Sequence, residues 1–171
     1  MASWTTPPTH VVGDALAVTD WNTIANNETF LYQRPYGLYT GTTASLAGGA
    51  TAQIAVASQG QNYGFTLSGN NAVLPLTGLY QFSWSMTTTG QASGQGVIRA
   101  SIYRNGALLF QGNTSMLYIN SGTPTSVGSG IWLCNASDTI ALYGTNTSAS
   151  AVTVGTAYTQ TNLQITWLGS I

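Results

Sequence analysis

Within residues 78–88, apolar and polar side chains alternate without a break from Tyr80 to Thr87. Successive side chains of a β-strand point to opposite faces of a sheet, so this alternation predicts a strand with one buried face. The apolar face consists of Tyr80, Phe82, Trp84 and Met86. Gln81, Ser83 and Ser85 occupy the other face. This is the clearest strand signal in the chain.

The next segment predicts a β-hairpin. Val97–Arg104 alternates again, and one of its faces is formed by Ile98, Ala100 and Ile102. Asn105-Gly106 follows directly and favours a type I′ turn, because both central residues of that turn need positive φ. Ala107–Gln111 is then expected to run back along the first strand.

Further short strands are expected around this hairpin, separated by turns rich in Gly and Ser. They span residues 36–42, 51–56, 63–67, 72–74, 115–119, 127–133, 139–143, 151–157 and 163–168. Short strands at this spacing predict an all-β fold, which is a sandwich, a jelly roll or a barrel.

The first part of the chain is different, and we divide the sequence into residues 1–35 and 36–171. Trp4–Gly13 contains Pro7-Pro8 and is expected to form an extended arm. Residues 1–34 also hold three of the four carboxylates, Asp14, Asp20 and Glu28.

A short helix is expected over about residues 20–33. Thr19-Asp20 can supply its N-cap, and Pro35 ends the pattern. The stripe that recurs at steps of three and four consists of Trp21, Ile24, Glu28 and Leu31, with Ala25 beside it. So short a helix is marginal by itself in water. It is therefore expected to dock, either on its own domain or on a neighbouring protein.

Charged side chains make up only 4% of the chain, and none of them is a lysine. An ordinary soluble domain has about 25%. Three arginines cannot form the basic stripe that nucleic acid requires, and a chain without lysine lacks a basic patch for an anionic membrane. We expect neither partner. Two interpretations of so uncharged a surface are open. Either hydroxyl and amide groups alone keep a free domain soluble or, as we favour, partner copies cover much of the surface.

The N-terminus has no basic region followed by an apolar segment, so we expect no secretory signal peptide. No stretch approaches the ~20 apolar residues that span a bilayer. Cys134 is the only cysteine, which excludes an internal disulfide.

The residue types of catalytic sites are almost missing. The only histidine, His10, lies in the proline-rich arm and has no expected partner for nucleophilic catalysis. Cys134 ends an apolar strand and is expected to be buried. Asp138 is the only carboxylate after residue 35, and its place in a turn indicates turn hydrogen bonds. We predict no enzyme activity, no metal site and no cofactor.

Four segments resemble jelly rolls of the C1q/TNF type. They are LPLTGLYQFS at 74–83, IYRNG at 102–106, GSGIWLCNASDTI at 128–140 and LQITWL at 163–168. Ser137-Asp138 stands where the family usually has Gly-Asp, and the acidic loops that bind calcium in some C1q domains are absent. The resemblance implies an antiparallel jelly-roll sandwich that forms a homotrimer with aromatic side chains along the threefold axis. Candidates for the axis, or equally for the monomer core, are Tyr80, Trp84, Trp132 and Tyr143.

The N-terminal segment resembles the start of many tailed-phage virion proteins. The resemblance lies in Trp4 to Thr9, in Gly13 to Leu16 and in Thr19 to Asn22 with the residues that follow. It implies a segment that docks on another virion protein. The candidate anchoring residues are Trp4, Pro7, Pro8, Trp21, Ile24, Phe30 and Leu31.

Three functions remain open. The first is a homotrimeric capsid decoration or cement protein on the virion, held to the major capsid protein by its N-terminal arm. The second is the receptor-binding tip of a tail or head fibre, with Tyr118, Tyr143 and Tyr158 contacting a neutral host glycan. The third is a C1q-like bacterial binding domain unrelated to phage.

Overall fold

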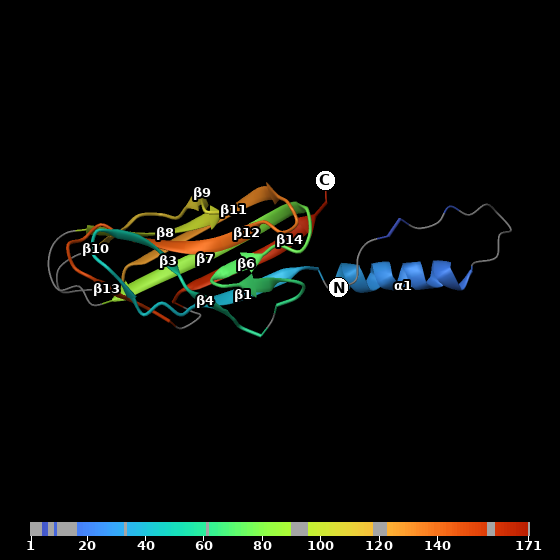
Figure 1. The fold of residues 1–171 in the computed structure, drawn as a ribbon, viewed down its shortest axis with the longest axis horizontal. Helices are drawn as coiled ribbons and strands as arrows, with labels where there is room; N and C mark the ends of the chain where they lie inside the picture. Colours follow the sequence, from blue (N-terminus) through green and yellow to red (C-terminus); the bar gives the residue numbers. More distant parts are fainter. Residues whose placement is uncertain are drawn as a thin grey trace. The chain divides into compact units, whose positions relative to one another are not determined.

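A computed structural model (Figure 1) describes residues 5–6, 9, 17–32, 34–60, 62–89, 96–117, 123–156 and 160–170. The chain divides into two compact units, Met1–Arg34 and Pro35–Ile171. Each unit is described separately below. The predicted anchoring residues Trp4, Pro7 and Pro8 lie outside the described residues.

The first unit is built on helix α1 (Val18–Tyr32). The helix begins two residues before the predicted start, and Asp20 is not its N-cap. The Asp20 carboxylate instead reaches back from the first turn and accepts a hydrogen bond from the Ala17 N–H at 2.7 Å. A carboxylate in the first turn also lies favourably in the helix dipole.

The start of the chain is tied to this helix through one amide side chain. Asn27 accepts from the Thr5 N–H at 2.8 Å and donates to the Thr5 carbonyl at 2.7 Å. These two hydrogen bonds resemble the pair that two facing residues exchange in an antiparallel sheet. The Asn27 side chain is buried. At Thr5, therefore, the predicted arm is bonded to its own helix.

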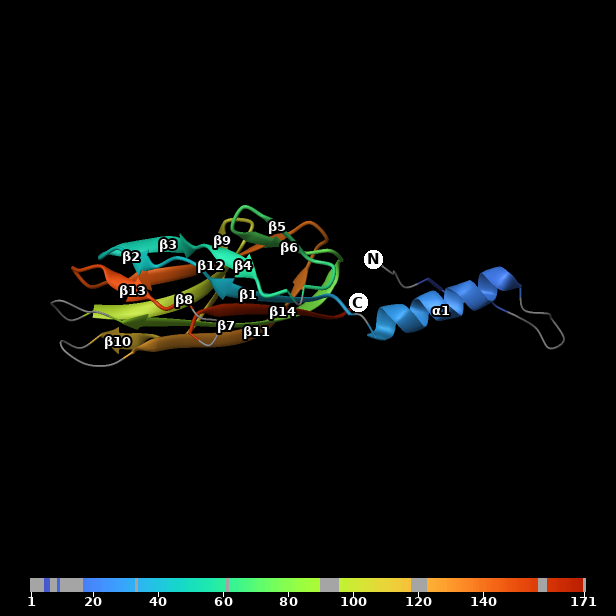
Figure 2. The ribbon, with the colours of Figure 1, turned by 90° about the horizontal axis from the view of Figure 1, so that it is seen from below.

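The second unit contains two antiparallel sheets. The first sheet is centred on β7 (Gly78–Thr89), which pairs with β11 (Thr125–Cys134) on one side and with β14 (Asn162–Gly169) on the other. Figure 2 shows these strands side by side. Beyond β14 the sheet continues with β1 (Tyr36–Gly41) and β4 (Val56–Ser58). Two short strands, β13 (Val152–Val154) and β2 (Ser45–Leu46), extend it from the end of β7.

The second sheet is centred on β8 (Gly96–Arg104) and β12 (Thr139–Asn146). The outer neighbours of β8 are β9 (Ala107–Gln111) and β10 (Ser115–Leu117). The outer neighbours of β12 are β3 (Ala50–Ile54) and β6 (Asn71–Val73), and β6 pairs in turn with β5 (Thr66–Ser68).

The strand predicted over residues 51–56 is in fact two strands in different sheets. β3 belongs to the second sheet and β4 to the first, and the chain changes sheets at Ala55. There, the Ala55 carbonyl accepts from Thr42 N–H and the Ala55 N–H donates to Thr43 Oγ1. These bonds satisfy the backbone at the corner. Strand β2 was not predicted.

The core lies between the sheets and follows the predicted faces. Tyr80, Phe82, Trp84 and Met86 of β7 are all at most 2% exposed. They face Ile98, Ala100 and Ile102 of β8, which are fully buried. The prediction that β7 and β8 each have one buried face is confirmed.

Two tight turns contain residues with positive φ. Asn105 and Gly106 have φ of 50° and 80°, which confirms the type I′ hairpin. Ser137 has φ of 71°, so the residue that replaces the usual glycine adopts the left-handed conformation. Asp138 makes the predicted turn bonds, accepting from Asn135 N–H at 2.9 Å and from Asn105 Nδ2 at 2.6 Å.

Replacing Ser137 with glycine should stabilise the β unit. A non-glycine residue in the left-handed region destabilises the folded state by about 1–2 kcal/mol. Glycine removes this strain, but it also makes the unfolded chain more flexible, which offsets part of the stabilisation. We expect S137G to raise the free energy of unfolding in urea by about 0.5–1 kcal/mol. The matched control is S68G, because Ser68 lies exposed in extended strand β5, where glycine is expected to destabilise. Equal effects of the two changes would contradict the prediction.

Candidate assembly surface

Strand β11 is paired along only one of its edges. Alternate residues of an antiparallel strand direct their N–H and C=O groups toward the partner strand and away from it. On the side away from β7, Val127 bonds to Asn113 through both groups, and the Leu133 carbonyl accepts from Arg104 at 3.1 Å. Between them, the outward backbone groups of Ser129 and Ile131 have no partner among the described residues.

Large apolar side chains are exposed along this edge. Those of β11 are Val127 (49% exposed), Ile131 (55%), Trp132 (47%) and Leu133 (47%). We call these four residues the apolar edge. No charged residue occurs anywhere in residues 107–134.

Contacts between aromatic rings connect the apolar edge to the core. Phe110 of β9 packs edge-on against Trp132, with ring centroids 6.0 Å apart, and stacks on buried Trp84. Gly128 and Gly130 leave the space that these rings need. A Cβ at Gly128 would lie 2.3 Å from the Trp84 ring, and one at Gly130 would lie 2.7 Å from Phe110.

The outer face of the first sheet is uncharged. Beyond the edge strand β11, strands β7, β14 and β1 contain no Asp, Glu, Lys or Arg. Their pairing places outward residues in rows across the sheet, such as Gln81, Thr166 and Tyr36. Such a face can be covered by another protein without desolvating a charge. We call it the uncharged face.

The predicted aromatic candidates occupy three different environments. Tyr80 and Trp84 lie in the monomer core and are not available to a threefold axis. Trp132 lies at the apolar edge. Tyr143 is half-buried and stacks on Tyr103, with ring centroids 4.0 Å apart. Of the anchoring candidates, Trp21 and Ile24 are 59% and 45% exposed on α1, while the side chains of Phe30 and Leu31 lie outside the description.

Sequence reasoning missed Val127, Ile131 and Leu133 as candidate contact residues. The signal was present, because Ile131-Trp132-Leu133 interrupts the alternation of β11 with consecutive apolar residues. Three such residues in a strand exposed at one edge cannot all face the core.

The polar groups at the end of β11 are engaged in contacts within the fold. Arg104 lies 3.8 Å from Asp138, which is itself engaged in the turn. Burial raises the pKa of the Tyr80 hydroxyl to about 12, and this hydroxyl donates to the Leu76 carbonyl.

The part of the chain described here contains no group of three or more His, Cys, Asp or Glu residues that could hold a metal. Within the same part, no helix combines the length and apolar character that a membrane span needs.

Comparison with known proteins identifies the fold. No family model and no curated protein matches the sequence. Among solved structures, Eiger TNF from S. frugiperda is 12% identical with a TM-score of 0.59, and the match covers 81% of this chain and 96% of that one. Murine APRIL at pH 8.0 is 14% identical with a TM-score of 0.56, covering 79% and 99%. The TNF-like jelly-roll fold is therefore confirmed, whereas these comparisons give no indication of a phage origin.

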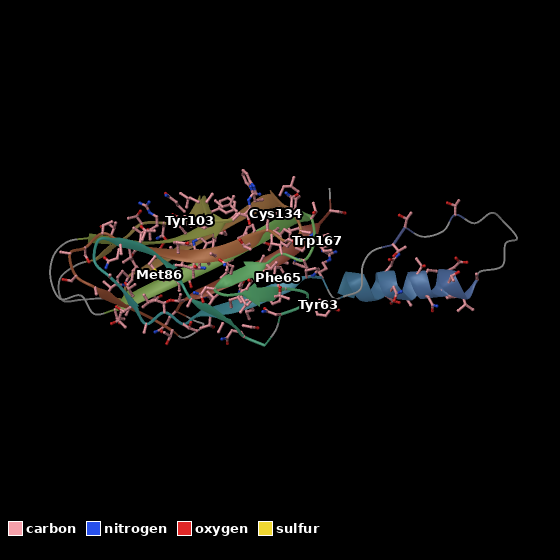
Figure 3. All side chains as sticks on the ribbon, in the orientation of Figure 1. Tyr63, Phe65, Met86, Tyr103, Cys134 and Trp167 are labelled. Atoms are coloured by element: carbon pink, nitrogen blue, oxygen red, sulfur yellow. The ribbon has the colours of Figure 1, made fainter. Side chains whose placement is uncertain are left out.

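Cys134 ends β11 as a buried thiol, as predicted (Figure 3). Burial raises the pKa of this thiol above its ordinary value, and the Arg104 guanidinium offsets part of the rise. The thiolate is the form that reacts, so the native protein should stay unreactive as pH rises from 7 to 9. We expect iodoacetamide to label it at least ~100-fold more slowly than the same chain in 6 M guanidinium, followed by mass spectrometry. Fast labelling of the folded protein would show that the thiol is accessible.

Proposed function

We propose that this protein is a homotrimeric structural module in which the apolar edge of each copy packs on the uncharged face of the next. The observation that supports it is the run of exposed apolar residues on an open strand edge whose own strand contains no charged residue. Soluble proteins normally protect such edges with lysine, proline or a covering segment. An edge left bare in this way is best explained by a permanent partner.

The number of copies follows from the kind of contact. An edge and a sheet face are different surfaces, so their contact is heterologous and must either close into a ring or continue as a filament. The TNF-like jelly rolls that this fold resembles are homotrimers, which favours a closed ring of three. The near-neutral surface fits a block whose apolar and amide groups are covered by copies of itself.

The trimer is proposed to act on a virion as a capsid decoration or cement protein. The support is the resemblance of the N-terminal segment to tailed-phage virion proteins, together with the exposed side of α1. Val18, Trp21 and Ile24 are 75%, 59% and 45% exposed there. An apolar helix side of this kind can dock in a groove of another protein, here the major capsid protein.

The trimer is tested by placing a charge on the apolar edge. I131D should bury a carboxylate in the proposed interface and weaken each contact by roughly 30-fold or more, as for a central interface residue. We expect size-exclusion chromatography with light scattering to show a trimer for the native chain and a monomer for I131D. L67D is the matched control, since Leu67 is exposed on β5, far from this edge in the pairing order. A monomeric native chain at micromolar concentration would overturn the proposal.

The anchor is tested separately. The double variant W21S/I24S should remain trimeric but lose co-sedimentation with virus particles assembled without the protein. Deletion of residues 1–34 should have the same effect, because the β unit keeps its own core. If both altered proteins still co-sediment, the N-terminal unit is not the anchor.

A further inference from the structure

A stacked tyrosine pair lies on the outer face of the second sheet. Tyr103 of β8 and Tyr143 of β12 have ring planes inclined by 27°. Ser101 points outward on the same face, as its register with Tyr143 shows, yet it is only 4% exposed. The residues around Ser101 therefore cover the sheet there. Both tyrosines, of which Tyr103 is labelled in Figure 3, remain partly exposed.

Arg99 lies on the same outer face, two residues along β8 from Ser101. Among the described residues its guanidinium is held by neutral groups alone, through contacts to Thr114 Oγ1 at 3.3 and 3.1 Å and to Gln111 Oε1 at 3.1 Å. The other arginine of this unit, Arg104, lies beside Asp138. Asp138 is the only Asp or Glu in residues 35–171, and Arg104 already lies beside it. No other acidic side chain of this unit is left to neutralise Arg99.

The Arg99 guanidinium is held in place by these contacts and still has N–H donors that they do not use. A guanidinium has five N–H donors. Its three contacts to Thr114 and Gln111 use one N–H on each nitrogen, so one N–H remains on each terminal nitrogen. A side chain already held in place loses less entropy when it binds a ligand. Two donors on the terminal nitrogens suit a carboxylate.

Planar amides flank the tyrosines. The strand registers place Gln53, Tyr143, Ser101 and Gln111 in one row across β3, β12, β8 and β9. Gln53 is fixed by donating from Nε2 to Asn71 Oδ1 at 2.9 Å and to the Asn70 carbonyl at 3.1 Å. Amide groups on both sides of the rings can bond the hydroxyls of a ligand.

We propose that this face binds an acidic oligosaccharide. The apolar C–H side of a sugar ring would lie on the tyrosine pair, its carboxylate would bind Arg99, and its hydroxyls would bond Gln53 and Gln111. A ligand that combines a flat apolar side, many hydroxyls and a carboxylate matches all three kinds of group. The site lies on the second sheet, whereas the apolar edge is built mainly on β11 of the first, so it goes beyond the proposed trimer and does not depend on it.

The test is a calorimetric titration of the full chain with two uronic acid probes. One is a hexasaccharide of alternating glucuronic acid and N-acetylglucosamine, and the other is a hexamer of galacturonic acid. Carboxyl-reduced forms of both provide the neutral comparison. We expect at least one acidic probe to bind, and its reduced form to bind at least tenfold more weakly.

Variants assign the binding to this face. Y143A and R99Q should each weaken binding about tenfold or more, Y143F should retain it, and R99K should lie between R99Q and the native chain. The matched controls are Y63A, at the isolated bridge beside β1, and R34Q, in the N-terminal unit. Both should bind as the native chain does. Circular dichroism checks that each variant is folded.

Several results would overturn the proposal. They are no binding of either acidic probe, equal binding of acidic and reduced forms, and unchanged binding by Y143A and R99Q. Equal affinity for a hexaglutamate peptide would show that the face recognises carboxylates without a sugar. None of these results depends on whether the protein is a trimer, so failure here leaves the assembly proposal intact.

Discussion

A continuous series of aromatic contacts between the two sheets determines the rest of the β unit. Phe65 packs against Tyr80, Tyr80 stacks on Phe82, and Phe82 contacts Phe110, which lies between Trp84 and Trp132. Large rings contribute more buried area than any other side chains. Because the series passes from β7 to β9 and ends on β11, the same packing that fills the core also fixes the edge of the first sheet.

The proposed functions occupy different sides of this core. The apolar edge and the uncharged face are built mainly on the first sheet, whereas Arg99 and the tyrosine pair lie on the outer face of the second. A sandwich can therefore assemble through one sheet and bind a ligand on the other. The near lack of charge serves both proposals. It removes repulsion between copies, and it leaves a single arginine in the β unit without an acidic partner.

Local structure could be predicted because it depends on neighbours in the chain. Alternation at residues 78–88 predicted both the strand and its buried face, and Asn105-Gly106 predicted the hairpin. The helix start was wrong by two residues because Asp20 bonds backward to Ala17 instead of capping forward. The change of sheets at Ala55 was missed because an extended chain has the same local pattern in either sheet.

The strand faces, the turns and the division near residue 35 could be predicted from the sequence, since each depends on short-range periodicity and backbone preference. Which strand is an edge could be learned from the arrangement of the strands alone. Side-chain alternation specifies a face, but not whether a second strand lies alongside. Trp84 and Trp132 both belong to inward rows, yet one is buried because β7 has neighbours on both sides, and the other is exposed because β11 has one. Tyr103 and Tyr143 likewise meet only through the pairing of β8 with β12.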